Sequence, residues 1–331
     1  MKHFTRIIAL TAGLALCSGS SRAIDNNTVE VYYNGTTATV TVASNIADYI
    51  TVESGTSSHV KITQSEDFAG VDATTDNTDG EITYSLSGTT TDGEFYLEGQ
   101  YKCTIELNGV TITSKGENAP LTIKNGKRVA ISAKKDKVST LTDADTDTLS
   151  GCIHSKGHLK FKGKGTLNIV ANSKHGIYSK EYCELKNLTL NITAAPKDGI
   201  HCKNYFLMKS GTVGITGAQD DGIQVELDGE TSTGETTDHE DEDSGNFYQE
   251  DGTLTISNYD GKAVKADGTI TYNGGTQNFD TSDTEQYAEV KSLTTKPSED
   301  DSDSATYDVN GKRVDSRAKG IVIRNGKKIK Q

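Results

Sequence analysis

An internal repeat of about 23 residues constrains the fold of this chain more than any other feature. The tripeptide Asp-Gly-Ile occurs at positions 198–200 and again at positions 221–223. One apolar column recurs at intervals of 24, 23, 23 and 41, and the last interval equals 23 plus an insertion of 18: Ile153, Ile177, Ile200, Ile223 and Val264. Two more columns keep the intervals of 23, 23 and 41: Leu167, Leu190, Val213 and Leu254, then Ile169, Ile192, Ile215 and Ile256. The repeat therefore belongs to the whole segment.

Short β runs separated by glycine turns at this period predict a solenoid in which each repeat is one coil. Segments such as GTLNIV and LTLNIT alternate apolar and polar residues, and no segment after residue 23 keeps a helical apolar period for more than a turn. A leucine-rich repeat has a similar period, but its leucine and asparagine framework is missing. We expect an all-β, right-handed parallel β-helix with about 23 residues per coil, capped by N-terminal strands within residues 24–80.

The amino-terminal stretch, positions 1–23, has the build of a secretory signal peptide. Lys2 and Arg6 precede an apolar run, and small residues precede a cleavage site after Ala23. An alternative places a lipid anchor on Cys17, although Leu16 is a poor neighbour for that cleavage. No later run is long enough to cross a bilayer. We expect an exported monomer, secreted or held at the cell surface.

Composition divides the rest of the chain. We expect the β-helix over residues 24–292, with an acidic insertion at about 227–249, then a linker at 293–304 and a C-terminal segment at 305–331. The acidic runs in the insertion and at 299–303 are typical of solvated loops or linkers. Four cysteines remain after residue 23, and because no CxxC pair suggests zinc they are expected to be buried thiols: Cys103, Cys152, Cys183 and Cys202.

The charge is unevenly distributed. The net charge is -13, yet residues 150–226 carry ten lysines against six carboxylates. The sequence has neither an arginine-rich stripe nor an aromatic pair set among basic residues. It therefore gives no indication of a nucleic-acid partner.

Alternation along a strand places the residue after each inward isoleucine on the outside of the coil: His154, Tyr178, His201 and Gln224. Two positions further on, a second outer column contains Lys156, Lys180, Lys203 and Glu226. Flat rings can stack on sugar faces, while imidazole, amide and ammonium groups can hydrogen-bond hydroxyls or carboxylates. One interpretation is a polysaccharide site. The other is an ordinary strand face chosen for solubility.

The Asp-Gly pairs also have two interpretations. Glycine allows a positive φ and close packing of neighbouring coils, and an aspartate before it can cap the turn. Alternatively, Asp198, Asp220 and Asp221 supply hard oxygen ligands for calcium. Asp260 precedes a glycine in the next coil but is offset from this column, so it is a weaker candidate ligand.

Several motifs, in this order, resemble the bacterial carbohydrate-binding proteins with a pectate-lyase-like β-helix: LNGVTITSKGENAPLTI, STLTDAD, KDGIHCK, DDGIQVE and GTLTISNYDGKAVKADGTITYNGG. The resemblance covers about residues 28–280. It implies binding of a cellulose-like or acidic pectic polysaccharide such as polygalacturonate, with Ca²⁺ at Asp198, Asp220 and Asp221. LSGCIH and SKHGIY carry no aspartate at the corner, so fewer calcium sites are expected than in the family.

The C-terminal segment has a resemblance of its own. YDVNGKRV, KGIVI and NGKK, in that order, are similar to the short C-terminal sorting domain of Bacteroidetes surface proteins. This implies a role in export or surface attachment.

Parallel β-helices also include pectate lyases and polygalacturonases, which use a basic residue or clustered aspartates. Arg128 is the one arginine between residues 24 and 312, and no tight group of three carboxylates is evident. Lys180 and Lys203 remain candidate bases. We expect non-catalytic binding of polysaccharide, with a calcium-dependent lyase as the alternative and a structural or adhesive surface protein as a third possibility.

Overall fold

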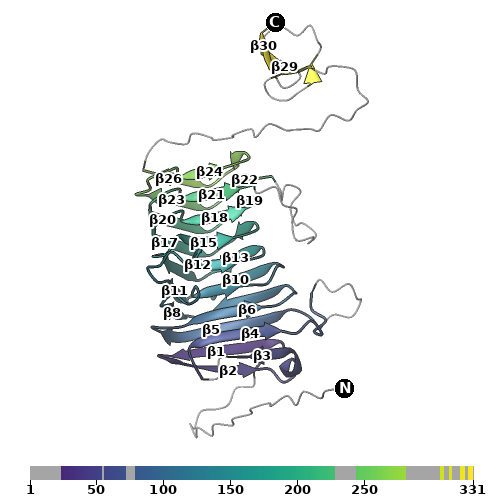
Figure 1. Cartoon of the computed structure of the whole chain (residues 1–331), viewed down its shortest axis with the longest axis vertical. Coiled ribbons are helices and arrows are strands. Elements are labelled where there is room, and N and C mark those ends of the chain that lie inside the picture. Colours follow the sequence, from purple (N-terminus) through teal and green to yellow (C-terminus); the bar gives the residue numbers. More distant parts are fainter. Residues whose placement is uncertain are drawn as a thin grey trace.

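The computed structural model describes residues 24–53, 56–71, 79–227 and 244–280, and the backbone of four short strands between residues 306 and 330. Within these residues the regular structure is β apart from one 3-10 turn, Ala47–Tyr49. The strands wind around one axis in stacked coils, from the purple N-terminal end to the green C-terminal end (Figure 1). The fold is the all-β, right-handed parallel β-helix that the repeat predicts.

Each coil has three sides, and one of them is a nine-stranded sheet. Its members from β4 to β24 pair in parallel, whereas β3 and β4 are antiparallel. The strands are β3 (Ile50–Val52), β4 (His59–Gln64), β6 (Glu94–Glu98), β9 (Leu121–Ile123), β12 (Gly151–Ser155), β15 (His175–Ser179), β18 (Ile200–Lys203), β21 (Ile223–Glu226) and β24 (Val264–Ala266).

The other two sides form one 17-stranded sheet. The side that follows the nine-stranded sheet contains β7 (Cys103–Leu107), β10 (Val129–Ala133), β13 (Leu159–Gly163), β16 (Cys183–Leu185), β19 (Tyr205–Met208), β22 (Asn246–Gln249) and β25 (Ile270–Tyr272). The last side contains β8 (Thr111–Thr113), β11 (Val138–Thr142), β14 (Thr166–Val170), β17 (Thr189–Ala195), β20 (Thr212–Ala218), β23 (Thr253–Ser257) and β26 (Thr276–Phe279). The long strand β5 (Ile82–Thr90) pairs with both β7 and β8.

The N-terminal end is closed by a hairpin. Strand β1 (Thr28–Asn34) adds to β5 in parallel, and β2 (Thr37–Val42) runs antiparallel to β1. The antiparallel pair ends the parallel stack, which confirms the predicted capping strands and protects the first coil from edge-to-edge pairing.

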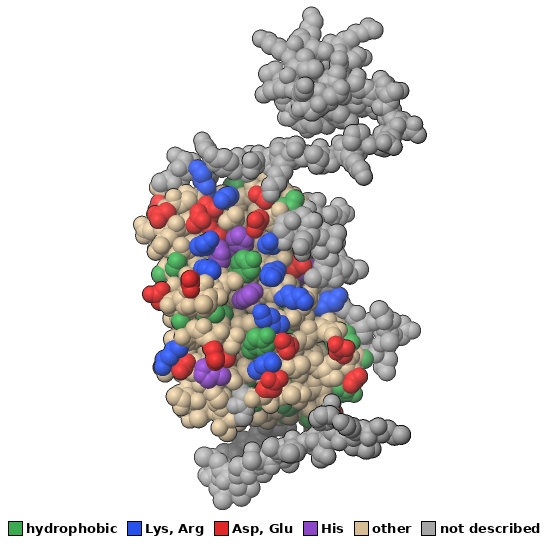
Figure 2. Space-filling view, viewed as in Figure 1, with side chains coloured by type: hydrophobic (Ala, Val, Ile, Leu, Met, Phe, Trp, Pro, Cys, Tyr) green, Lys and Arg blue, Asp and Glu red, His purple; other side chains and the backbone are tan. Residues whose placement is uncertain are grey.

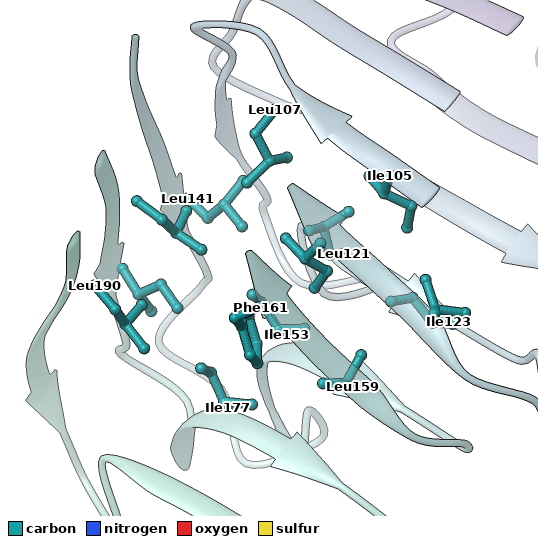
Figure 3. Packing of buried hydrophobic residues seen from close by; sticks show 14 of the residues in the cluster. Ile105, Leu107, Leu121, Ile123, Leu141, Ile153, Leu159, Phe161, Ile177 and Leu190 are labelled. Carbon is teal, nitrogen blue, oxygen red and sulfur yellow. The ribbon is translucent and has the colours of Figure 1, made fainter. Parts of the chain in front are cut away.

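The interior is filled by ladders of apolar side chains. Leu121, Ile153 and Ile177 lie in register on β9, β12 and β15, and each is fully buried. Figure 3 shows them packed with Leu141, Phe161 and Leu190 from the other two sides. Burial of each such side chain contributes about 1.5–3 kcal/mol, so the ladder is the main source of stability. The four cysteines are buried free thiols, as expected.

The coil length is constant only from β15 to β21. The strand partners Ile177, Ile200 and Ile223 follow one another at a constant interval along the chain. The partners Phe95 and Leu121 are further apart in sequence, and Leu121 and Ile153 are further apart still. The additional residues lie in the corners between strands. The ladder therefore keeps its register while the corners vary in length.

The insertion that interrupts the repeat occupies one such corner. Lys203 pairs with Glu226, and Tyr205 pairs with Asn246, so the additional residues lie between β21 and β22. The expected range of 227–249 extends too far, because Asn246–Gln249 is strand β22. Residues 228–243 lie outside the described residues.

The C-terminal segment has an antiparallel sheet of its own, in the order β28, β27, β29 and β30. Its strands are β27 (Thr306–Asp308), β28 (Arg313–Val314), β29 (Ile321–Arg324) and β30 (Lys327–Lys330). The predicted signal peptide, Cys17 and the predicted linker lie outside the described residues, and the sorting role stays a prediction. In the described part of the chain we find no helix with the length and apolarity needed to span a bilayer.

Candidate functional site

Three glycines at one corner bring successive coils into close contact. Gly176, Gly199 and Gly222 stack in register, and a Cβ on each would lie about 2.5 Å from an isoleucine methyl carbon and within 2.7 Å of a backbone oxygen. None of the three has a positive φ. The glycines are therefore required for space and not for a left-handed turn. The expected close packing is confirmed, and the expected positive φ is wrong.

The aspartates before Gly199 and Gly222 join one coil to the next. Asp198 Oδ1 accepts a hydrogen bond from the backbone N–H of Asp221 at 3.0 Å, and Asp221 Oδ1 accepts one from the backbone N–H of Lys262 at 2.7 Å. Both aspartates are buried. Each carboxylate thus satisfies a backbone donor in the following coil, and the turn-capping role extends between coils.

Two histidines contact the second oxygen of Asp198. His201 Nδ1 hydrogen-bonds Oδ2 at 2.9 Å, and His175 Nδ1 lies 3.2 Å from the same oxygen. Burial raises the pKa of Asp198, but the side-chain contacts with His175 and His201 outweigh burial and hold this pKa well below its usual range. Burial also lowers the pKa of His175. Asp198 is therefore a carboxylate fixed between two imidazoles.

Aromatic rings form a row on the outer face of the nine-stranded sheet. The His154 and Tyr178 rings meet edge to face at 5.6 Å, and Tyr178 stacks on His201 at 5.2 Å. His175 stacks on the Tyr178 ring at 5.5 Å. Burial and the charges of Lys124 and Lys180 lower the pKa of His154 to about 4, so this ring is neutral at pH 7. We call His154, Tyr178 and His201 the aromatic row.

Lysines flank the aromatic row. Lys156 and Lys180 are exposed, while Lys203 is half-buried and its Nζ lies 3.9 Å from Glu226 Oε2. Figure 2 shows this face, with histidine and hydrophobic side chains along its middle and Lys or Arg side chains beside them. The register aligns the rings of His154, Tyr178 and His201, and each lysine follows its ring by two positions in the sequence.

The predicted outer column is confirmed in direction but not in exposure. His154, Tyr178 and Gln224 are partly exposed, whereas His201 is only 8% exposed. The reason is that the His201 ring lies against Tyr178 while Asp198 and Glu226 face its two nitrogens, with Nε2 3.2 Å from Glu226 Oε2. His201 therefore holds its neighbours in place and exposes little of its ring for contact with a ligand.

Sequence reasoning missed two residues at this corner. His175 occupies the column of Asp198 and Asp221, one repeat before Asp198, and the shared interval was the signal that could have identified it. Lys265 Nζ lies 3.1 Å from Asp221 Oδ2 and balances its charge. Lys265 follows Val264 in the repeat and pairs with Gln224, so the same column could have identified it.

The carboxylates can be compared with the demands of Ca²⁺, which takes six to eight oxygen ligands. Oxygens of Asp198, Asp220 and Asp221 lie within 4.8 Å of one another, as do ligand atoms of His175, Asp198 and His201. Three of the four oxygens of Asp198 and Asp221 face N–H or imidazole groups, and Asp221 Oδ2 lies 3.1 Å from Lys265 Nζ without a hydrogen bond among the described residues. This donor set fits calcium poorly without rearrangement, and calcium binding stays a prediction.

Asp220 and Asp260 differ from the two buried aspartates. Both are exposed. Asp260 donates its backbone N–H to Ala218 O at 3.1 Å, and it joins none of the candidate metal groups in the described residues. The offset noted in the sequence is therefore present in the structure.

Comparison with known proteins agrees with the fold. A solved structure, that of the polysaccharide lyase-like protein from C. thermocellum in a gadolinium derivative, matches with a TM-score of 0.55 and 21% identity over 76% of this chain and 94% of that chain. No curated protein matches. A family model, carbohydrate-binding domain-containing protein, matches residues 71–327. The chain therefore belongs to this family of carbohydrate-binding domain-containing proteins.

Proposed function

We propose that the outer face of the nine-stranded sheet binds a polysaccharide and does not cleave it. The observation that supports this most directly is the aromatic row with a lysine beside each ring. The partly exposed rings of His154 and Tyr178 provide apolar surface for a sugar, and ammonium groups provide donors beside it. Together with the family, this favours a glycan chain over a small ligand.

The geometry favours a chain that runs along the solenoid axis. Neighbouring strands are about 4.8 Å apart, so successive rings and lysines repeat at this distance. A pyranose unit in an extended polysaccharide advances by a similar distance. One sugar can therefore meet one coil, and each additional coil adds an equivalent contact.

The charge favours an acidic polymer such as polygalacturonate, with a cellulose-like glucan as the neutral alternative. Although the net charge is -13, the coils from 150 to 226 are locally basic by four charges, ten lysines against six carboxylates. The Debye length is about 8 Å at physiological salt, so local lysines govern contact. Distant acidic residues repel the polymer little at this range.

The non-catalytic part of the proposal rests on how the titratable groups are engaged. Both ring nitrogens of His201 face carboxylates, and Asp198 is held between two histidines. Arg128 pairs with Glu81 at 3.8 Å, away from the aromatic row. A lysine-base lyase remains the alternative, and it would release unsaturated products that absorb in the ultraviolet when the protein is incubated with polygalacturonate and calcium.

We also propose that the protein acts outside the cytoplasmic membrane, secreted or at the cell surface, on the support of residues 1–23 and 305–331. Amino-terminal sequencing of the exported protein tests cleavage after Ala23. A pull-down on insoluble glycans separates a glycan binder from a purely structural or adhesive surface protein, which would not be retained.

Two variants test the site. Replacing Lys156, Lys180 and Lys203 by Gln should weaken binding to polygalacturonate and reduce its salt dependence. Tyr178→Ala should weaken binding to a neutral glucan more than the triple variant does.

A matched control removes three exposed lysines from another side of the β-helix: Lys162, Lys164 and Lys186. It changes the net charge by the same amount, so loss of binding in both triple variants would indicate a non-local charge effect. If neither the site variant nor Tyr178→Ala differs from the parent, the site lies elsewhere.

A further inference from the structure

We propose that a groove beside the N-terminal coils of the same sheet is a second subsite, which binds a uronate unit of the polysaccharide. The groove has a volume of about 840 Å³ and follows the ends of β4, β6, β9 and β12. Six of its lining residues carry the argument: Gln64, Tyr96, Glu98, Lys124, Lys127 and Lys156. This inference rests on the proposed function, which it extends to a place that the repeat does not reveal.

Tyr96 provides an aromatic wall. It lies on the outward face of β6, is partly exposed, and donates its phenolic hydrogen to Glu98 Oε1 at 3.1 Å. Lys61 Nζ lies 5.5 Å from the centre of the ring. The hydrogen bond and the cation limit the orientations of the ring, so a flat surface is available before a sugar arrives.

Gln64 places a buried acceptor in the wall of the groove. Its side chain is only 4% exposed, and Oε1 has no hydrogen-bond partner among the described residues. A Cβ at Gly99 would lie 3.1 Å from this oxygen, so the glycine keeps the space beside it free of a side chain. A buried acceptor without a partner costs about 1–3 kcal/mol. This oxygen has almost no accessible surface, so it makes the wall of the groove polar and is not a contact of the bound sugar.

The charges of the groove decide between neutral and acidic sugars. Lys124, Lys127 and Lys156 line it together with two carboxylates, Glu66 and Glu98. The carboxylates can accept from hydroxyls, and the excess positive charge matches the carboxylate of a uronate. A neutral hexose has no charge that would balance this excess positive charge.

The groove is continuous with the aromatic row. Register places Tyr96, Thr122, His154 and Tyr178 at equivalent positions on β6, β9, β12 and β15. Lys156 lines the groove and also flanks the aromatic row. Three strand spacings, about 14 Å, separate Tyr96 from Tyr178, so a chain of about four sugars can contact both.

The absence of tryptophan from the sequence provides a direct probe. In Tyr96→Trp, oligogalacturonates of increasing length should change the fluorescence of the single tryptophan, and affinity should rise when the chain reaches about four units. Val138→Trp places the probe at a 59% exposed position on the last side of the coil, where no change is expected. Neutral gluco-oligosaccharides should give a smaller response.

Charge removal provides a second measurement. Lys124→Gln combined with Lys127→Gln should lower the affinity for long oligogalacturonates by about fivefold or more and lower the affinity for short ones, held by the aromatic row, by less, because of these two lysines only Lys124 acts on His154.

The outcomes separate this inference from the proposed function. If the parent binds the oligomers but the Tyr96→Trp variant gives no signal and the double lysine variant binds normally, the second subsite is wrong and the proposed function stands. If gluco-oligosaccharides change the fluorescence of Tyr96→Trp equally, the uronate assignment is wrong. If the parent binds no glycan, the proposed function fails and this inference with it.

Discussion

Replacing Asp198 tests whether the corner aspartates stabilise the fold by themselves or only through a metal ion. In Asp198→Ala, the buried N–H of Asp221 loses its acceptor at 3.0 Å, and His201 loses the carboxylate at 2.9 Å. A buried donor left unsatisfied costs about 1–3 kcal/mol, and a hydrogen bond to a charged group is worth about 1.5–3 kcal/mol. We therefore expect the free energy of unfolding to fall by about 3–5 kcal/mol. Asp198→Asn keeps an acceptor for Asp221 and should lose about half as much.

The assay is thermal unfolding followed by circular dichroism at pH 7, with a chelator present in every sample. For a domain of this size, such losses correspond to a lowering of the Tm by about 10 °C. Asp260→Ala is the control, because Asp260 is exposed and should change the stability by less than about 0.5 kcal/mol. If Asp198→Ala melts at the same temperature as the parent under chelation, the hydrogen-bond argument is refuted.

Three further outcomes are expected. Ile200→Asp places an unpaired charge in the dry interior and should prevent folding, so a soluble variant with the parent's circular dichroism would contradict the inward ladder. If the aspartates hold calcium, chelation should lower the Tm of the parent. Lys265→Gln frees Asp221 Oδ2 and should enlarge the rise in Tm on adding calcium. Equal rises in both proteins would show that Lys265 does not compete with the ion. The pKa of His154 is lowered to about 4 in the folded chain, whereas an unfolded histidine is protonated near pH 6.5. The unfolded state therefore binds one more proton between these pH values, and up to about 3 kcal/mol of folding stability is lost as pH falls from 6.5 to 4. His154→Gln should lose less in that window, and denaturant unfolding at both pH values measures the difference.

The fold could be predicted because one physical constraint is repeated in the sequence. Each coil must place an apolar residue at the same inward position, so Ile177, Ile200 and Ile223 recur at the coil length. The same alternation fixed the direction of Tyr178 and Lys180. Direction follows from the strand alone and needs no knowledge of the neighbours.

Burial and pairing at the site depend on neighbours, and these could be predicted only in part. His201 is buried because Asp198 and Glu226 engage its nitrogens, and nothing in the local pattern of β18 indicates this. Tyr96 and Gln64 were not recognised, because the irregular corners of the N-terminal coils hide which residues share a column. The register of these coils becomes visible only when the strands are paired.

The corner between β21 and β22 shows that the length of a connection can change while the register of the strands is kept. Partners on either side of it remain in register although the chain that joins these two strands is much longer than in the preceding coils. Because the ladders bear the folding free energy and surface corners tolerate added length, we expect foreign peptides grafted after Glu226 to leave the coils intact. The β-helix is thus suited to displaying new loops beside a fixed sheet face, and evolution or engineering can alter these loops with little loss of stability.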